Sequence, residues 1–180
     1  MAGSAVLNPV AILTAARVLP GMHIADLQVD RNGHLVFPAA QMVGLEGKVY
    51  GVHLVNDVLN MLEGRRRQYL VHNLELVQGD IQAGDLDIPE ASLDRVFMLH
   101  TLATVSDHAQ IVAEIRRLLK ADGVVVVIDW HPQTQHPIAP KSEFRLHPNR
   151  VDSAFMQGGC EVCGHFNPSE WHWGRMYRRL

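Results

Sequence analysis

The sequence predicts an α/β fold: a doubly wound, Rossmann-like sheet of seven mostly parallel strands, with helices on both faces. Short apolar runs alternate with segments of helical periodicity, which is typical of parallel strands joined by crossover helices. Two further runs, at residues 161–166 and 172–178, are joined by only a short link. Such a link favours an antiparallel pair at a sheet edge, so we expect one antiparallel strand near the C-terminus.

The composition is that of one globular domain spanning residues 1–180, with 47% hydrophobic and 19% charged residues. The net charge of -3 gives no basic field for nucleic acid, and the basic run 65–67 is expected at a helix C-terminus. No apolar run approaches the roughly 20 residues of a membrane span, and the start of the chain lacks a signal-peptide pattern. We therefore expect a cytoplasmic protein that binds neither nucleic acid nor membrane.

The first half of the chain is expected to contain three strands and three helices. Asn8 and Pro9 open a helix as N-cap and first-turn proline, and Pro20 and Gly21 end it. The other expected helices are residues 35–43 and 56–66, and the expected strands are residues 23–27, 48–54 and 74–78.

The second half continues this alternation. A strand at 94–99 precedes a helix that Ser106 and Asp107 cap and that 121–123 (ADG) end. Residues 124–130 (VVVVIDW) form the most apolar strand, which predicts a central position buried on both faces. A polar stretch and a short helix at 151–157 then lead to the closing strand pair.

Several segments together resemble the class I S-adenosylmethionine-dependent methyltransferase family, type 11 group. The segment LPGMHIADL resembles the lead-in to the family's first strand, and FPAAQMVGLEGKVYGVH its first helix and second strand. NLELVQGD resembles the third strand, IVAEIRRLLKADGVVVVIDW the fourth helix and fifth strand, and MQGGCEV the late helix. The resemblance covers residues 8–180 and implies a methyltransferase acting on a small molecule.

The resemblance implies a cofactor loop after the first strand, with the pattern acidic-x-Gly-x-Gly-x-Gly. Asp26 matches the acidic start, but Gln28, Asp30 and Asn32 stand at the glycine positions, with Gly33 one residue on. Glycine there lets the backbone turn and approach the cofactor closely. Each replacement adds a side chain, and Asp30 would add negative charge near the carboxylate of the cofactor.

The resemblance also implies an acidic residue at the end of the second strand, which would accept hydrogen bonds from both ribose hydroxyls. His53 stands there instead, and neutral imidazole has only one acceptor and one donor. The loss is worth about 1.5–3 kcal/mol, roughly tenfold to a hundredfold in affinity. Asp80 and Ile81 match the segment whose Asp meets the adenine amino group. We expect S-adenosylmethionine binding to be weakened or lost; the alternative is that the loop re-forms and binding persists.

The chain has 11 histidines, and four of them follow expected strands at the carboxyl rim where α/β folds bind ligands: His34, His53, His100 and His131. They could be independently exposed, or they could line one crevice. His100 and His131 are candidate catalytic residues, since a general base activates a methyl acceptor. His34, His53 and His100 are candidate metal ligands. No spacing such as His-x-x-x-His supports a metal, so we expect none.

The last part of the chain holds two further clusters. Cys160 and Cys163 could suggest a zinc site, but there is no second Cys pair, and residues three apart on a strand face opposite sides. We therefore expect buried thiols instead of a zinc site. Residues 171–173 (WHW) are expected to pack as an aromatic cluster. Three functions stay open: a methyltransferase acting on a small molecule, a non-catalytic relative that binds a small molecule or protein partner, and a histidine-lined crevice repurposed for another ligand. A homodimer is a further expectation.

Overall fold

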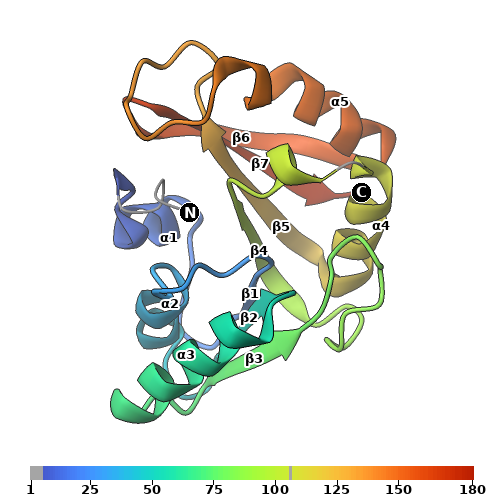
Figure 1. Ribbon diagram of the computed structural model, residues 1–180. Helices are drawn as coiled ribbons and strands as arrows, with labels where there is room; N and C mark the ends of the chain where they lie inside the picture. Colours follow the sequence, from blue (N-terminus) through green and yellow to red (C-terminus); the bar gives the residue numbers. More distant parts are fainter. Residues whose placement is uncertain (1–5, 106) are drawn as a thin grey trace.

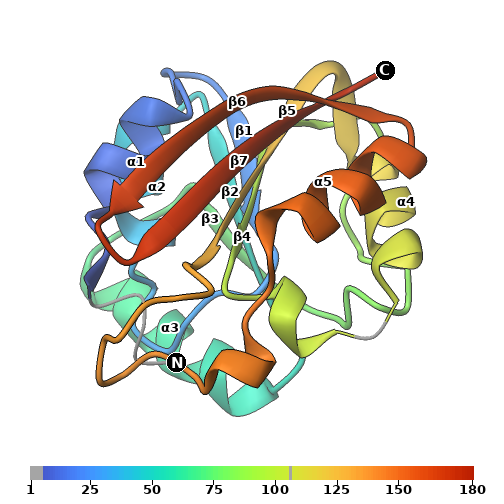
Figure 2. The same cartoon turned by 90° about the horizontal axis from the view of Figure 1, so that it is seen from above.

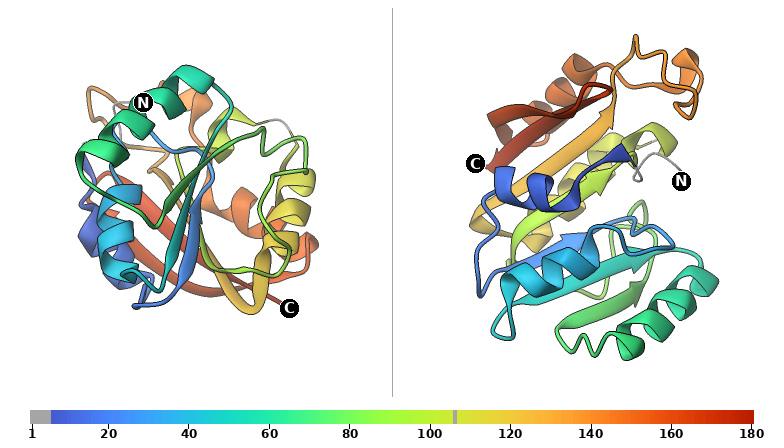
Figure 3. Two further views of the ribbon diagram at one scale, coloured as in Figure 1. Left: turned by 90° about the horizontal axis from the view of Figure 1, so that it is seen from below. Right: turned by 90° about the vertical axis from the view of Figure 1, so that its left-hand side faces the viewer.

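The computed structural model describes residues 6–105 and 107–180, and its centre is one seven-stranded sheet in the order β3-β2-β1-β4-β5-β7-β6 (Figure 1). Strand β7 runs antiparallel to both of its neighbours, and the other pairs are parallel. The predicted sheet is therefore confirmed. The strands are β1 (His23–Asp26), β2 (Lys48–His53), β3 (Leu74–Gln78), β4 (Leu93–Leu99), β5 (Leu119–Trp130), β6 (Cys160–Ser169) and β7 (His172–Arg179). The right panel of Figure 3 shows this order from β3 at the bottom to β6 and β7 at the top.

Helices cover both faces of the sheet (Figure 2). One face carries α1 (Pro9–Ala15), α2 (Val36–Val43) and α3 (Asn56–Gln68). The other carries α4 (His108–Leu118) and α5 (Pro148–Gln157), and two short 3-10 helices follow β4 and β5, η2 (Leu102–Thr104) and η3 (Ser142–Phe144). Asn8 caps α1 as predicted, because its Oδ1 accepts a hydrogen bond from the Ala11 N–H at 3.1 Å. Among the described helices, none is long and apolar enough to cross a membrane.

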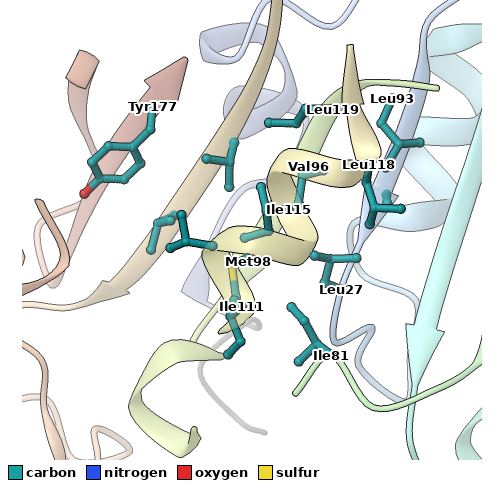
Figure 4. Close-up of a cluster of buried hydrophobic side chains, with 14 of the residues drawn as sticks. Leu27, Ile81, Leu93, Val96, Met98, Ile111, Ile115, Leu118, Leu119 and Tyr177 are labelled. Carbon is teal, nitrogen blue, oxygen red and sulfur yellow. The ribbon is translucent and has the colours of Figure 1, made fainter. Parts of the chain in front are cut away.

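The core lies in two layers, one on each face of the sheet. Under α4, the side chains of Ile111, Ile115 and Leu118 face Val96 and Met98 of β4 (Figure 4). The second layer forms where α1, α2 and α3 meet the opposite face. Strand β5 contributes to both layers in alternation, since successive side chains of a strand point to opposite faces: Val125 and Val127 to the first, Val126 and Ile128 to the second. Its predicted burial on both faces is confirmed.

The boundary between α4 and β5 differs from the prediction. Residues 121–123, expected to end the helix, lie inside β5, and the helix already ends at Leu118. The register against β4 shifts here: Leu93 pairs with Leu119 and Arg95 with Val124. A bulge therefore absorbs the Ala-Asp-Gly segment, and its partner strand, not its own turn propensity, fixes its conformation. Ser106, expected in the cap of α4, lies outside the described residues.

The C-terminal part brings two smaller corrections. Helix α5 begins at Pro148, three residues earlier than predicted, because the His147 side chain accepts the Asn149 N–H and Pro148 fits the first turn. Cys160 is buried as expected, but Cys163 is exposed. Cys163 lies at a register shift between Val162 and Gly164 and lines an open hollow at the surface beside the end of α1.

Candidate functional site

A crevice opens where the carboxyl ends of β1, β2 and β3 meet the segment after β4. Its volume is about 280 Å³, just below the roughly 300–1,000 Å³ typical of small-molecule sites. We call it the β1–β3 crevice. Of the predicted cofactor residues it brings together Gln28, His53, Asp80 and Ile81. Its full lining is Leu27, Gln28, His53, Leu54, Gly79, Asp80, Ile81, Gln82, Thr104 and Val105.

The β3 side of the crevice pairs a carboxylate with apolar walls. Asp80 follows β3, and its Oδ1 accepts the Gln82 N–H at 2.9 Å, which fixes the carboxyl group at the rim. Ile81 and Leu27 lie beside it and are anchored in the core. A carboxylate is a pure acceptor, so this corner suits a flat heterocycle that carries an amino group.

The β2 side of the crevice carries His53, whose ring orientation is fixed. Its Nδ1 accepts the Val55 backbone N–H at 2.9 Å. Burial, and then the nearby Arg31 guanidinium, lower the pKa of His53, so the ring is neutral. With Nδ1 acting as acceptor, the proton is on Nε2. His53 therefore offers the crevice a single donor, where the resemblance implies a double acceptor.

The residues directly after β1 form a turn whose backbone is hydrogen-bonded to the neighbouring strands. The Leu27 N–H donates to the Phe97 carbonyl at 3.1 Å, and the Val29 N–H to the Val52 carbonyl at 3.0 Å. Leu27 and Val29 are buried in the two core layers. Gln28 stands between them in a turn and lines the crevice beside Leu27. A side chain thus occupies space that glycine would leave open.

Asp30 and Gly33 shape the turn into α2. Asp30 Oδ1 accepts the Asn32 N–H at 2.6 Å and the His34 N–H at 3.4 Å, so its carboxylate satisfies the loop backbone and is absent from the crevice lining. Gly33 has a φ of +65°, and a Cβ there would lie 2.5 Å from the Phe37 ring. The one remaining glycine thus serves the turn and its packing.

Asp26 closes β1 as a buried carboxyl group, only 5% exposed. Burial, and then the neighbouring Asp30, raise its pKa to about 7, although its Oδ1 accepts the Gln28 N–H at 3.3 Å. Asp26 is therefore poised between its neutral and charged forms near neutral pH. It lies behind the β1–β3 crevice rather than in its lining.

A second group of polar side chains lies at the carboxyl ends of β4 and β5 and the start of β7. We call it the imidazole–indole cluster: His100, Trp130, His136, Trp171 and His172. The His172 ring lies 4.1 Å from that of Trp130 and 5.0 Å from that of His100, measured between centroids. His136 covers the cluster, 5.5 Å from Trp130 and 4.4 Å from Trp171.

The two inner imidazoles of this cluster are buried and neutral. Burial lowers the pKa of His100 to about 4, and burial with the neighbouring histidines lowers that of His172 to about 3. The Nε2 atoms of both rings lack a hydrogen-bond partner, which costs about 1–3 kcal/mol per atom. His100 also has a left-handed backbone, with φ +56°, a strained conformation that is enriched at functional sites.

The four histidines predicted at the rim separate into different environments. His53 lines the β1–β3 crevice, whereas His34 Nε2 bonds the Leu7 carbonyl oxygen at 2.7 Å. His100 belongs to the imidazole–indole cluster, and the backbone N–H of His131 donates to the Trp171 carbonyl nearby. Across residues 6–105 and 107–180, no three His, Cys, Asp or Glu side chains group as metal ligands.

Sequence reasoning missed His136, His172 and Trp130 as site residues. The aromatic run 171–173 predicts packing for His172. The signal that could have found it is the antiparallel pairing of β7 with β5. That pairing places Trp130 opposite His172, at the same rim as His100.

The β1–β3 crevice fits the adenosine part of S-adenosylmethionine. Asp80 offers an acceptor to the adenine amino group, and Leu27 and Ile81 offer apolar contact to the ring. His53 offers one hydrogen bond to the ribose in place of two. The residues present thus supply the acceptor and apolar walls that an adenine needs, and one hydrogen bond fewer for the ribose.

Comparisons with known proteins show the family and the fold of this chain. A family model described as a methyltransferase domain matches residues 31–127. The demethylmenaquinone methyltransferase of Lactococcus lactis is 31% identical over 131 residues, which are 72% of this chain and 49% of that protein. This chain therefore spans about half the length of that relative.

Solved structures show the same fold. A SAM-dependent methyltransferase from Aquifex aeolicus superposes with a TM-score of 0.90 at 19% identity, covering 99% of this chain and 93% of that one. The [4+2]-cyclase SpnF superposes with a TM-score of 0.80 at 11% identity, covering 95% and 79%. At these identities the likeness shows the fold alone. The family model, in contrast, matches more than half of the sequence, and the chain belongs to the methyltransferase domain family.

Proposed function

We propose that this protein is an S-adenosylmethionine-dependent methyltransferase for a small-molecule acceptor, with cofactor affinity reduced at the ribose position. The observation that carries the proposal is the β1–β3 crevice, which places the Asp80 carboxylate beside the apolar walls of Leu27 and Ile81 at the carboxyl ends of the parallel strands. Ligands of open α/β sheets bind at this edge.

Each lining residue then has a definite task. Asp80 accepts a hydrogen bond from the adenine amino group, and Leu27 and Ile81 exclude water from the ring. His53 donates one hydrogen bond from Nε2 to a ribose oxygen, because Nδ1 is held by Val55. Gln28 narrows the passage beside β1. The bound cofactor supplies an electrophilic methyl group.

The alternative is a non-catalytic relative that uses the crevice to bind a small molecule or to support a partner protein. Gln28, Asp30, Asn32 and His53 together favour it, since all four replace residues that the cofactor loop and the second strand would carry. The fold is compatible with both, because one fold hosts different chemistries.

Calorimetry with S-adenosylmethionine and S-adenosylhomocysteine separates the two. We expect the wild-type protein to bind both and the Asp80→Ala variant to bind at least about tenfold more weakly, the equivalent of one hydrogen bond to a charged group. Asp87→Ala is the matched control, an exposed aspartate on the same connection. Absence of binding in the wild type would overturn the proposal. Binding without methyl transfer from radiolabelled cofactor to any small acceptor would favour the non-catalytic alternative.

A further inference from the structure

Two buried imidazole nitrogens of the imidazole–indole cluster have no hydrogen-bond partner. Among the described residues, five buried side-chain atoms lack such a partner, and two of them are His100 Nε2 and His172 Nε2. Two more, Asp129 Oδ2 and Trp173 Nε1, belong to neighbouring residues whose side chains point to the opposite face of the sheet. Buried polar groups are nearly always paired in folded proteins. Two exceptions within one cluster at the carboxyl rim of the sheet therefore indicate a place where a ligand supplies the partners.

The topology explains how these atoms come together. His100 follows the last residue of β4, and Trp130 ends β5. Strand β7 begins at the same rim because it runs antiparallel to β5, which pairs Trp130 with His172 and Asp129 with Trp173. The Ser169 hydroxyl lies 2.7 Å from His172 Nδ1, so the His172 ring is held with Nε2 as its unused atom.

The chemistry of the cluster restricts the ligand. Its walls are aromatic, which favours a flat ring in stacked or edge contact. The rings of His100 and His172 are uncharged at neutral pH, so nothing in the inner cluster selects an ion. Two imidazole nitrogens on rings 5.0 Å apart suit a hydroxyl group, because a hydroxyl both donates and accepts.

We infer that the imidazole–indole cluster binds an uncharged, flat hydroxyaromatic molecule, with its hydroxyl between His100 and His172 and its ring against Trp130. Under the proposed function, this molecule is the methyl acceptor. The biological role of the site therefore rests on the proposed function, whereas the binding of the molecule does not. His100 and His172 are positioning residues here, and they hold the hydroxyl by hydrogen bonds.

Entry requires the His136 ring to move, since it covers Trp130 from the outer side. The segment 132–145 that carries His136 is hydrogen-bonded to itself. Arg145 donates to the carbonyls of Pro132, Thr134 and Pro140 at 2.6–3.1 Å. A segment tied together in this way can shift as a unit, and the ligand ring then takes the place of the imidazole that it displaces.

Equilibrium dialysis with two probes tests the inference without cofactor. 2-Naphthol carries the hydroxyl, and 2-methoxynaphthalene has the same ring system without a hydrogen-bond donor. We expect the wild-type protein to bind 2-naphthol at least about tenfold more tightly than 2-methoxynaphthalene, as one lost hydrogen bond implies. In His172→Phe, which keeps an aromatic ring and removes the nitrogens, the two probes should bind alike.

His72→Phe makes the same change at an exposed site on the other side of the molecule and should keep the preference. If His172→Phe fails to fold by circular dichroism, His100→Phe replaces it with the same expectation. A wild type without hydroxyl preference, or a folded variant that retains it, overturns the inference. S-adenosylhomocysteine titration of the same wild-type sample separates the claims. Cofactor binding without naphthol preference removes this inference alone, and naphthol preference without cofactor binding removes the proposed function alone.

Discussion

The Nδ1 atom of His53 accepts the backbone N–H of Val55 at 2.9 Å, and this bond decides what the crevice can offer a ribose. A neutral imidazole has only one bare nitrogen, so the nitrogen directed away from Val55 carries the proton. A carboxylate at the same position would present acceptors alone. The replacement therefore reverses the direction of the hydrogen bond at the end of β2.

The tautomer of His53 can be observed directly. We predict that nitrogen-15 NMR at neutral pH shows His53 with an unprotonated Nδ1 and a protonated Nε2. Burial lowers the pKa of His53 below the ordinary value for histidine, so the ring should be neutral at neutral pH. A protonated Nδ1 in the neutral ring would contradict the hydrogen bond from Val55.

Gly33 is predicted to be less replaceable than Gly21, although both have positive φ. Alanine at Gly21, with φ +81° and nothing within 4 Å, should cost about 1–2 kcal/mol of backbone strain. Alanine at Gly33 adds a Cβ 2.5 Å from the Phe37 ring, which should cost about a further 1–3 kcal/mol. Urea unfolding of both variants measures the difference. Equal losses would show that the Phe37 contact relaxes freely.

The Arg117–Glu114 pair holds the connection after β3. Arg117 Nη2 lies 2.6 Å from Glu114 Oε1 and 2.9 Å from the Leu86 carbonyl, and Glu114 is only 3% exposed. Arg117→Met leaves a buried carboxylate unpaired and should lower the free energy of unfolding by about 3 kcal/mol. The control is Arg67→Met, whose guanidinium pairs with a carboxylate at the surface and should cost under about 1 kcal/mol. Comparable losses in chemical denaturation would count against a special role for the buried pair.

Asp129→Asn is predicted to change how stability depends on pH. Burial raises the pKa of Asp129 from 3.8 to about 7. Between pH 3.8 and about 7 the folded protein holds a proton on Asp129 that the unfolded chain has released. The contribution of Asp129 to stability therefore falls as pH rises. Asparagine has no such proton. As pH rises through this range, the free energy of unfolding of Asp129→Asn should therefore increase relative to that of the wild type by about 1.4 kcal/mol per pH unit.

Denaturant unfolding of the wild type and Asp129→Asn, at several pH values between 4 and 7, checks this shift. Other buried groups that titrate, among them Asp26 and His172, are present in both proteins and cancel in the comparison. A stability difference that stays constant across the window would mean that Asp129 ionises in the folded protein as it does in water.

The sequence was sufficient for the sheet because local patterns and the family resemblance pointed to the same elements. The first strand, the cap at Asn8 and the closing antiparallel pair all follow from short-range signals. The bulge at residues 121–123 did not follow, because an Ala-Asp-Gly run ends a helix by its own propensity. Here the register with β4 overrides that propensity.

The candidate site was predictable only in part, for a similar reason. Asp80 and His53 could be placed because the resemblance implies cofactor contacts just after the third strand and at the end of the second. The pairing of His100 with His172 joins residues far apart in sequence through the order of β4, β5 and β7. Hydrophobic periodicity carries no information on that order, so it could not decide whether His34, His53, His100 and His131 lie together or apart.

Titration of S-adenosylhomocysteine into the wild type and His53→Asp tests the central claim most directly. An aspartate at this position restores an acceptor for the ribose hydroxyls, and we predict binding at least about tenfold tighter than in the wild type, which corresponds to 1.4 kcal/mol. His72→Asp adds the same charge at an exposed site and should leave the affinity unchanged. Equal affinity of the wild type and His53→Asp, or binding by neither, would contradict the assignment of this crevice to the cofactor with His53 at its ribose position.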